Sequence, residues 1–512
     1  MVRPALLAVV GSCVLLAGCL RQPVFANCDG DATCTANGVS GHCEADHACS
    51  VDDSTCPESG RRYVSSAPNA GACTAPPDAG VADTPDGPPS SGGRECIKGG
   101  KRTADTTCAM DVCAREPRCC SQQWDATCVR MAETMCQAHC STMAFVGGDY
   151  GQVFRTDTWT PIWDNHATIT EAQLGGYWAD FDDDGDDDVA IAGYANIYIY
   201  RTLGFDGTSL TMDGPPQKIE WGPLATQRSF NEVLDSRAGA WADIDGDGDL
   251  DLAVGGLFGL LLIENRSGTL VPKAVMLGRL KDGTSVGPTD AIALAWGDVD
   301  GDHDLDLVVG HNGFAATLYL NDGLGELTLA PWAGPPEVES VQFCNVDQDP
   351  EPEVVIGANG NGGTSAFVYE LTGSSIAAQG TPLGTAGWAV DTLCGDLDGD
   401  GDLDLFAGSY SGQPRAYVNQ GNAAIKWLSV TPPVTSGATP SDQQWGADIG
   451  DLDGDGDLDA VASGRNEPPM SIAVYRNTSP GADQVVLTQE ALIGTAIDIR
   501  SRNIELGSLP TR

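Results

Sequence analysis

The chain has 512 residues and a formal net charge of −45, with 72 acidic against 27 basic side chains. So acidic a surface repels nucleic-acid phosphates, which excludes nucleic acid as a partner. Hydrophobic residues make up 41% of the chain, so it is expected to fold, as several domains or one large repeat domain. The 18 cysteines indicate an oxidising compartment.

The N-terminus has the pattern of an export signal. Arg3 precedes an uncharged run that ends in Leu16-Ala17-Gly18-Cys19, and the run is shorter than the ~20 residues of a spanning helix. This ending resembles the lipobox of bacterial lipoproteins, which implies a signal peptide over residues 1–18 and lipidation of Cys19. Because Leu20 follows the cysteine, the resemblance implies a secreted protein at the outer membrane or cell surface of a Gram-negative bacterium. Its lipid would be its only attachment to the membrane. An ordinary signal peptide with an incidental cysteine is the alternative.

Fourteen cysteines form two dense blocks, one in residues 19–73 and one in 94–142, separated by a Pro/Gly-rich linker over 74–93. Segments this short need disulfides to fold, so we expect two cysteine-rich modules with undetermined pairing. A zinc site using Cys119, Cys120 and His139 is the alternative, which export disfavours. The second block resembles a cysteine-rich segment of secreted bacterial proteins with no implied activity. The disulfide candidates are Cys28, Cys34, Cys43, Cys49, Cys56, Cys73, Cys96, Cys108, Cys113, Cys119, Cys120, Cys128, Cys136 and Cys140.

An acidic nine-residue pattern recurs six times from Asp180 onward. Oxygen-bearing side chains stand at positions 1, 3, 5, 7 and 9, and glycine stands at position 6 in most copies. We number these copies loop 1 to loop 6. Their polar residues are Asp180, Asp182, Asp184, Asp186 and Asp188; Asp243, Asp245, Asp247, Asp249 and Asp251; Asp298, Asp300, Asp302, Asp304 and Asp306; Asn345, Asp347, Asp349, Glu351 and Glu353; Asp396, Asp398, Asp400, Asp402 and Asp404; and Asp451, Asp453, Asp455, Asp457 and Asp459.

This spacing is suited to calcium. Ca²⁺ takes six to eight oxygen ligands at 2.3–2.6 Å, and alternate acids on a curled loop converge on one point. A residue with positive φ at position 6 lets the chain turn back, so that the later positions complete the sphere. A solvated acidic turn is the alternative for one loop but not for six. Magnesium fits less well because it requires a near-ideal octahedron.

The residues after each loop exclude an EF-hand, which needs glutamate at position 12 between two helices. Here position 12 is always apolar, as at Val254, and the run Leu307-Val308-Val309-Gly310 is typical of a buried strand. The copies begin 47 to 63 residues apart, which also excludes a nonapeptide β-roll. The loops are therefore expected to connect strands.

Two further features accompany the loops. A tryptophan stands two residues before three of them, at Trp178, Trp241 and Trp296, and a later strand ends in asparagine and a turn, as at Asn321 and Asn477. Together they resemble the FG-GAP (VCBS-type) repeats of integrin α-chain β-propellers and many bacterial surface proteins, over residues 143–512. The resemblance implies an all-β propeller whose four-stranded blades each hold calcium. Positions 1, 3, 5 and 9 would give side-chain oxygens and position 7 mainly its carbonyl.

The repeat spacing predicts seven blades. The loops are about 54 residues apart on average, and residues 143–512 hold about seven such units. Residues 144–148 and 152–154 look like the second half of a blade, and 496–507 like an eroded first half. Joining the two would complete a seventh blade and remove free sheet edges.

Departures from the pattern indicate which loops should bind calcium less strongly. His303 replaces glycine at position 6 of loop 3, and histidine tolerates positive φ at a cost of ~1–2 kcal/mol. Loop 4 has Asn345 at position 1, Pro350 at position 6, where proline forbids positive φ, and Glu353 at position 9. We expect loop 4 to bind calcium more weakly than the other loops do. Calcium is expected at five or six sites in a structural role.

Cys344 and Cys394 stand in equivalent strands of neighbouring repeats. Packed sheets lie ~10 Å apart whereas a disulfide needs Cα atoms within ~7 Å, so only near the propeller axis could they bridge. Two separate buried thiols are the favoured interpretation. The tryptophans before the loops are expected to pack between blades, whereas Trp159, Trp163, Trp221, Trp332 and Trp427 are weaker candidates for stacking on a ligand.

The sequence has no HExxH motif and no phosphate loop. We therefore expect no catalytic residues and a non-enzymatic, calcium-stabilised surface lipoprotein that binds a protein or glycan partner, as in adhesion. A lectin-like glycan binder is the first alternative. An enzyme that processes a polysaccharide or a phosphoester is the less favoured one.

Overall fold

The structure is a computed structural model of residues 1–512. It describes residues 94–99, 106–169, 171–220, 236–257, 259–276, 290–349, 351–359, 366–372, 375–383, 389–410, 414–421, 427–430, 444–464, 471–479, 484–494 and 504–510, and the backbone of five short N-terminal strands. The chain divides into two compact units, Met1–Gly87 and Pro88–Arg512.

The first unit contains only short strands among its described residues. They are β1 (Thr35–Ala36), β2 (Val39–Ser40), β3 (His42–Cys43), β4 (Cys49–Asp52) and β5 (Arg61–Tyr63). β1 pairs with β2, and β3, β4 and β5 form a three-stranded sheet. The signal peptide, the lipidation site Cys19 and the disulfides expected for the first cysteine block lie outside the described residues.

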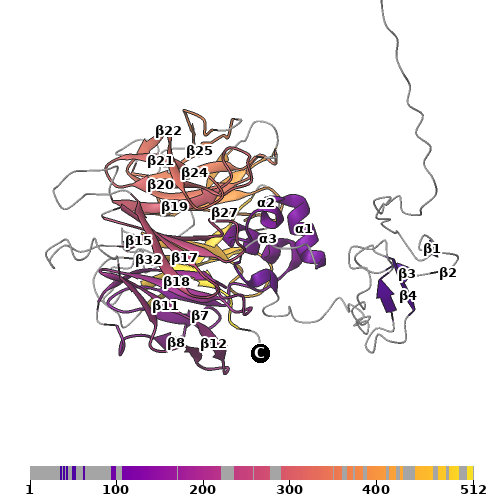
Figure 1. The fold of residues 1–512 in the computed structure, drawn as a ribbon. Helices are drawn as coiled ribbons and strands as arrows, with labels where there is room; N and C mark the ends of the chain where they lie inside the picture. Colours follow the sequence, from indigo (N-terminus) through magenta and orange to yellow (C-terminus); the bar gives the residue numbers. More distant parts are fainter. Residues whose placement is uncertain are drawn as a thin grey trace, which may run out of the picture. The chain divides into compact units, whose positions relative to one another are not determined.

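The second unit contains seven four-stranded antiparallel sheets, the blades of a propeller (Figure 1). Six blades run in chain order from the innermost strand outward. Blade 1 has β9 (Gln173–Ala179), β10 (Asp188–Gly193), β11 (Asn196–Tyr200) and β14 (Gln217–Glu220), and blade 2 has β15 (Ser236–Ala242), β16 (Asp251–Gly256), β17 (Gly259–Asn265) and β18 (Leu270–Met276). Blade 3 has β19 (Ala291–Gly297), β20 (Asp306–His311), β21 (Ala315–Asn321) and β22 (Leu327–Pro336), and blade 4 has β23 (Val338–Cys344), β24 (Glu353–Ala358), β25 (Ala366–Tyr369) and β26 (Thr381–Pro382). Blade 5 has β27 (Ala389–Gly395), β28 (Asp404–Ser409), β29 (Arg415–Asn419) and β30 (Trp427–Val430), and blade 6 has β31 (Gln444–Gly450), β32 (Asp459–Gly464), β33 (Ser471–Asn477) and β34 (Leu487–Gly494).

The seventh blade joins the two ends of this unit, as the sequence predicts. Its innermost strand is β35 (Ile504–Gly507), which pairs with β6 (Met143–Val146), followed by β7 (Gln152–Arg155) and β8 (Pro161–Asp164). Leu506 pairs with Ala144 at the centre of this contact. Such closure removes the unpaired edges that an open row of sheets would have. Residues 496–503, which belong to the expected first half of this blade, lie outside the described residues.

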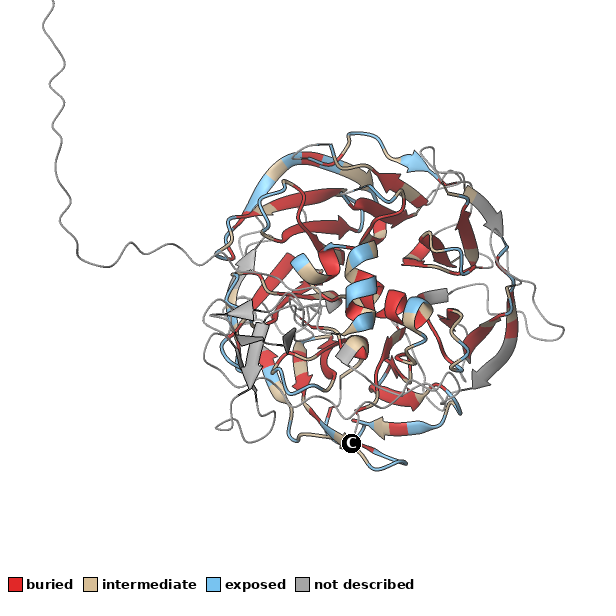
Figure 2. Cartoon of the chain, turned by 90° about the vertical axis from the view of Figure 1, so that its right-hand side faces the viewer, coloured by how far each residue is buried: buried red, intermediate tan, exposed pale blue. Residues whose placement is uncertain are grey.

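The apolar run after each acidic loop forms the second strand of its blade. All six residues of β10, β16, β20, β24 and β28 are buried, because neighbouring blades cover both faces of these strands. Figure 2 shows this buried interior as a ring of red strands. A hairpin of β12 (Thr202–Phe205) and β13 (Leu210–Met212) is inserted into blade 1.

The tryptophans before the first three loops pack between blades, as expected, and also donate hydrogen bonds across the blade boundary. The indole Nε1 of Trp178 donates to the carbonyl of Glu505 at 3.2 Å, and that of Trp241 donates to Tyr177 at 3.1 Å. The Trp296 Nε1 donates to the innermost strand of blade 2. Because each donor finds a partner, these rings can be buried at no hydrogen-bond cost.

The second cysteine block is helical, for which the sequence analysis made no prediction. It has a 3₁₀ turn η2 (Arg94–Cys96) and helices α1 (Thr107–Arg115), α2 (Arg118–Ser121) and α3 (Ala126–Cys136). Asp125 caps α3 by accepting hydrogen bonds from the backbone N–H groups of Thr127 and Cys128. We call residues 94–140 the helical cap. No helix among the described residues has both the length and the apolarity to cross a membrane.

All eight cysteines of the helical cap form disulfides. The pairs are Cys96–Cys140, Cys108–Cys136, Cys113–Cys120 and Cys119–Cys128. This confirms the expected cross-linked module and shows that the zinc alternative is wrong, because Cys119 and Cys120 are both bonded to other cysteines. Cross-links are needed because so short a segment buries little apolar surface.

The helical cap lies over the centre of the propeller (Figure 2). Arg130 of α3 is buried there, and it donates to Asp448 at 2.7 Å and to the backbone carbonyls of Ile449 and Cys394. Lys98 donates to the Glu505 carboxylate at 2.9 Å. Both contacts reach the innermost strands, so the cap is anchored to the propeller axis by hydrogen-bonded ion pairs.

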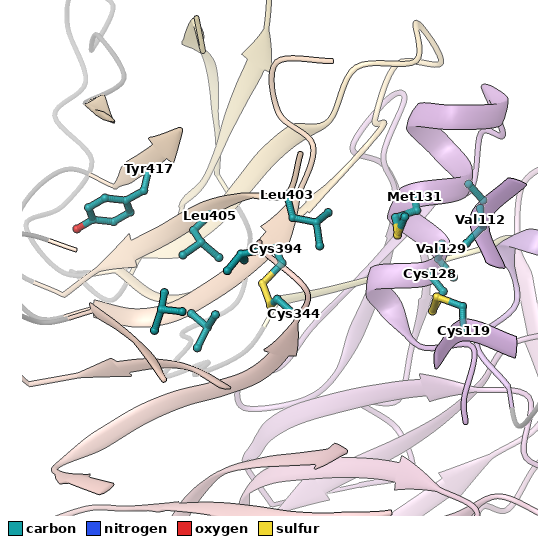
Figure 3. Packing of buried hydrophobic residues seen from close by; sticks show 14 of the residues in the cluster. Val112, Cys119, Cys128, Val129, Met131, Cys344, Cys394, Leu403, Leu405 and Tyr417 are labelled. Atoms are coloured by element: carbon teal, nitrogen blue, oxygen red, sulfur yellow. A yellow bond between two sulfur atoms is a disulfide. The ribbon is translucent and has the colours of Figure 1, made fainter. Parts of the chain in front are cut away.

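The apolar core of the cap is continuous with that of blades 4 and 5. Met131 and Cys128 belong to the same buried cluster as Leu403, Leu405 and Cys394 (Figure 3). A shared core means that cap and propeller cannot separate without exposing apolar surface. Beneath the cap, a cavity of about 230 Å³ follows the axis and is lined by Lys98, Arg130 and the inner strands.

Cys344 and Cys394 form a disulfide, so our preference for two separate thiols is wrong. Their Cα atoms are 6.4 Å apart, within the range that a disulfide spans. The reason is their place in the fold. β23 and β27 are the innermost strands of blades 4 and 5, where neighbouring sheets converge toward the axis and lie closer than ordinary packed sheets.

The closure of blade 7 can be tested with Leu506→Asp. Leu506 is 4% exposed, so the new carboxylate would be buried between β6 and blade 6, and we expect the melting temperature to fall by about 5 °C or more. Leu329→Asp is the control, because Leu329 is 54% exposed in β22. Scanning calorimetry on the two variants measures this. Equal melting temperatures would contradict the closure.

Candidate metal centres

The acidic loops connect the first and second strands of blades 1 to 6, as expected, and all lie on the propeller face that carries the cap. Their backbone has the predicted positive φ at position 6, as at Gly248 (96°), and His303 adopts 76° in loop 3. Position 6 of loop 4, Pro350, lies outside the described residues. The structure adds a second left-handed residue at position 4 of every loop. These residues are Asp183, Gly246, Gly301, Gln348, Gly399 and Gly454.

The carboxylate at position 1 holds the turn together. In loop 5 the two oxygens of Asp396 accept hydrogen bonds from the backbone N–H groups of Gly399 at 2.8 Å and Gly401 at 3.0 Å. The bond to position 6 recurs in loops 1, 2, 3 and 6. Position 5 is exposed and accepts from the N–H of position 7, a local Asx turn. Position 1 therefore curls the loop while position 5 shapes its outer half.

The carboxylate at position 9 is buried at the start of the second strand and joins three parts of the blade. In loop 3, one oxygen of Asp306 accepts from the N–H of Val299 at 2.8 Å, and the other accepts from the N–H of Asn321 at 2.9 Å. The same pair of bonds is made by Asp251, Asp404 and Asp459. Position 9 thus fixes both ends of the loop to the end of the third strand.

The asparagine that ends the third strand links neighbouring blades. The amide of Asn321 donates to the carbonyl of Leu305 in its own loop at 3.2 Å and to that of Ile244 in loop 2 at 2.8 Å. Asn265, Asn419 and Asn477 make the same two bonds. This asparagine is recognisable in the sequence as part of the repeat, but its role depends on contacts between blades. In blade 4 its place is taken by Leu371.

Five loops bring carboxylates together, three of them at positions 1, 3 and 9. In loops 1, 2 and 5 one oxygen from each of these positions lies within 4.8 Å of the others, and in loop 3 the group is Asp298, Asp300 and Asp302. In loop 4 the group is Asp347, Glu353 and Glu370, of which Glu370 lies outside the nine-residue pattern. The side chains at position 7 are in none of these five groups. The geometry is that of an oxygen site for a divalent cation.

Buried oxygens without a hydrogen-bond donor support the same conclusion. Within the described part of the chain, such oxygens include Oδ1 of Asp182 in loop 1, Oδ1 of Asp243 and Asp245 in loop 2, and Oδ1 of Asp300 in loop 3. A buried polar atom without a partner costs free energy, and a bound cation would remove that cost. The donor set is entirely oxygen, which suits Ca²⁺ rather than zinc or copper. The residues present therefore fit calcium.

Burial raises the pKa of every position-9 carboxyl, because the charged form loses its water and neighbouring acids repel it. The raised values are about 9 for Asp188 and Asp404, about 8 for Glu353, about 7 for Asp251 and Asp459, and about 6 for Asp306. Without a cation, Asp188, Asp404 and Glu353 therefore hold their protons at neutral pH, whereas Asp251 and Asp459 are partly protonated. A bound divalent cation would displace these protons.

In loops 1 and 6 an arginine from the end of the blade's third strand pairs with loop carboxylates. In loop 1 the Nε of Arg201 donates to Asp182 at 2.7 Å. In loop 6 the guanidinium of Arg476 donates to Asp459 and lies 3.7 Å from the Asp453 carboxylate. These ion pairs neutralise part of the charge that a cation would otherwise balance.

The tryptophans considered for ligand stacking have packing roles where the structure describes them. Trp332 is 9% exposed, and its Nε1 donates to the carbonyl of Ala377. Trp163 packs edge-on against Tyr200. Trp159 packs against the core between blades 6 and 7. Trp427 packs against the shared core of the cap and blades 4 and 5. Trp221 lies outside the described residues.

Two family descriptions match parts of the chain. Residues 180–254 and 396–462 match the FG-GAP-like repeat, and these stretches contain loops 1, 2, 5 and 6. Residues 94–140, the helical cap, match a domain of unknown function (DUF8252). The chain therefore contains FG-GAP-like repeats within a seven-bladed β-propeller. No curated protein matches it.

Two solved structures that the chain resembles are distant from it. An Agrocybe aegerita lectin, described for specific recognition of non-reducing terminal N-acetylglucosamine, is 16% identical with a TM-score of 0.45, over 70% of this chain and 90% of the lectin. BBS1N, solved in complex with ARL6DN, is 13% identical with a TM-score of 0.36, over 61% of this chain and 80% of that one. These values are too low to transfer a ligand from either protein.

The raised pKa values predict that the stability depends on pH without calcium but not with calcium. An acid whose pKa is higher in the folded state stabilises the fold below its unfolded pKa of ~4, and this contribution is lost as pH rises through the folded pKa. With a chelator, we therefore expect the melting temperature to fall between about pH 5 and 9, the upper limit being set by Asp188 and Asp404. When millimolar Ca²⁺ is bound in place of the protons, the melting temperature should no longer fall over this pH range. Parallel pH profiles would contradict this prediction.

The role of the asparagine predicts a loss of stability in Asn321→Ala. The variant leaves the carbonyls of Ile244 and Leu305 without their donor, at a cost of about 1–3 kcal/mol. Thermal unfolding in calcium should show a lower melting temperature. Thr328→Ala, a change at an exposed site in β22, is the matched control and should melt like the unmodified chain. A variant as stable as the control would show that the link between blades contributes little.

Proposed function

We propose that this protein is a non-enzymatic surface lipoprotein whose propeller, stabilised by calcium, binds a protein or glycan partner. The observation that carries the calcium part is the repeated convergence of carboxylate oxygens at positions 1, 3 and 9. Sites of this kind in extracellular modules bind Ca²⁺ at ~0.1–1 mM, so millimolar calcium would add up to about 1.4 kcal/mol per site. Across five or six loops this would rival the stability of an ordinary domain.

The face opposite the cap is the better candidate for binding a partner. The cap covers the centre of the loop-bearing face, where Arg115 contacts Asp402 of loop 5 and Lys98 contacts Asp187 of loop 1. Strand direction places the turns between second and third strands, and the connections between blades, on the other face. Phe314, in one of these turns, is 49% exposed. Loops on a rigid scaffold are where binding residues concentrate.

A binding role is favoured over catalysis because metal ligation and loop folding account for the paired carboxylates. Each position-1 and position-9 acid accepts backbone hydrogen bonds that shape the loop, as Asp396 and Asp404 do in loop 5. A catalytic pair of acids would instead face a substrate cleft. We further propose that Cys19 carries the lipid anchor and that the protein resides at the outer membrane or cell surface.

The test of this function has two parts, both on the full mature chain. A chelator should lower the melting temperature and added Ca²⁺ should restore it, because repulsion between the loop carboxylates then returns and is again neutralised. Affinity capture from envelope extracts, followed by mass spectrometry and a glycan array, should recover a partner in calcium and lose it in chelator. An unchanged melting temperature in chelator would refute the structural role of calcium. Detectable turnover of a polysaccharide or a phosphoester would refute the non-enzymatic role.

A further inference from the structure

One strand position faces every acidic loop and differs from blade to blade. In blade 4, Val354 pairs with Tyr369, so the next residue, Glu370, lies opposite the position-9 acid Glu353. The same register defines this position in every blade with a loop, and we call it the facing position. Its residues are Arg201, Glu264, Leu320, Glu370, Val418 and Arg476.

The arginines show that a side chain at the facing position reaches the loop carboxylates. Arg201 Nε lies 2.7 Å from Asp182 Oδ2, and Arg476 donates to Asp459. A glutamate at the same position can therefore reach the same oxygens with the opposite charge. In blade 4 it does so, because an oxygen of Glu370 lies within 4.8 Å of oxygens of Asp347 and Glu353.

Loop 4 also has a buried oxygen that no hydrogen bond satisfies. Asn345, at position 1, is 7% exposed, and its amide nitrogen donates to the carbonyl of Asp349 inside the loop at 2.7 Å. The side chain therefore points into the loop, and its Oδ1 is buried without a hydrogen-bond partner among the described residues. A neutral amide oxygen is an acceptable calcium ligand. It supplies no charge, however, so loop 4 lacks the anionic ligand that position 1 gives elsewhere.

We propose that Glu370 is a calcium ligand that replaces the missing position-1 carboxylate of loop 4, so that this loop binds Ca²⁺ through Asn345, Asp347, Glu353 and Glu370. The proposal rests on the calcium-binding role proposed above. It reverses the expectation from the sequence that loop 4 binds most weakly. By the same reasoning Arg201 and Arg476 weaken calcium binding in loops 1 and 6, because their guanidinium groups compete for the ligand oxygens.

Calcium binding to the full mature chain tests this proposal, measured by titration calorimetry and equilibrium dialysis. Glu370→Gln keeps the side-chain size and removes one charge from loop 4. We expect it to lose one bound Ca²⁺, or to bind there at least about tenfold more weakly, equivalent to 1.4 kcal/mol. Glu264→Gln is the matched control, because Glu264 occupies the facing position of blade 2 but pairs with Arg266 at 2.9 Å. It should bind calcium like the unmodified chain.

A second variant provides an independent measurement. Arg476→Leu removes the competing guanidinium and introduces the residue that blade 3 has at this position, so we expect tighter binding in loop 6. If the unmodified chain binds Ca²⁺ but Glu370→Gln binds it equally well, Glu370 is not a ligand while the calcium role stands. Equal losses in Glu370→Gln and Glu264→Gln would also overturn the assignment, because they would reflect overall charge. If the unmodified chain binds no Ca²⁺, the proposed function itself is wrong.

Discussion

The buried carboxylate at position 9 is the interaction on which the loop face depends. In loop 3, Asp306 receives the backbone N–H of the loop's second residue on one oxygen and that of Asn321 on the other, and Asn321 in turn bonds a carbonyl of blade 2. One acid therefore connects its loop, its own third strand and, through the asparagine, the preceding blade. Burial makes this carboxylate costly to ionise and raises its pKa, because the charged form loses its water.

Two further features of the propeller are the pairing of its strand edges and the covering of its central cavity. A row of blades has two exposed edges, and β35 removes them by pairing with β6. The axis leaves a cavity, and the helical cap covers one end of it with Arg130 and Lys98 bonded to inner-strand acids. The cap is cross-linked because it is too small to be stable by packing alone, and it shares its core with blades 4 and 5. Function is therefore expected from the opposite face.

The loops differ in how the charge of their carboxylates can be balanced. The fold needs oxygens at the same points in each blade, but charge can be balanced by a protein cation, as with Arg201, or by a metal ion. Blade 4 departs most, with Asn345 in place of aspartate, Leu371 in place of the linking asparagine, and Glu370 beside the loop oxygens. A mixture of arginine-filled and carboxylate-rich loops would make the propeller less dependent on any one calcium ion.

The sequence by itself determined the repeat, the seven blades, the joining of the two ends and the positive φ at position 6, because all of these follow from spacing and from residue type within one repeat. Apart from that joining, it did not determine contacts between residues far apart in the chain. The Cys344–Cys394 disulfide depends on how closely two inner strands converge, and the helical cap depends on pairing among eight cysteines. The place of Glu370 beside loop 4 depends on strand register. Such distances are set by packing of whole blades, so only the tertiary structure decided them.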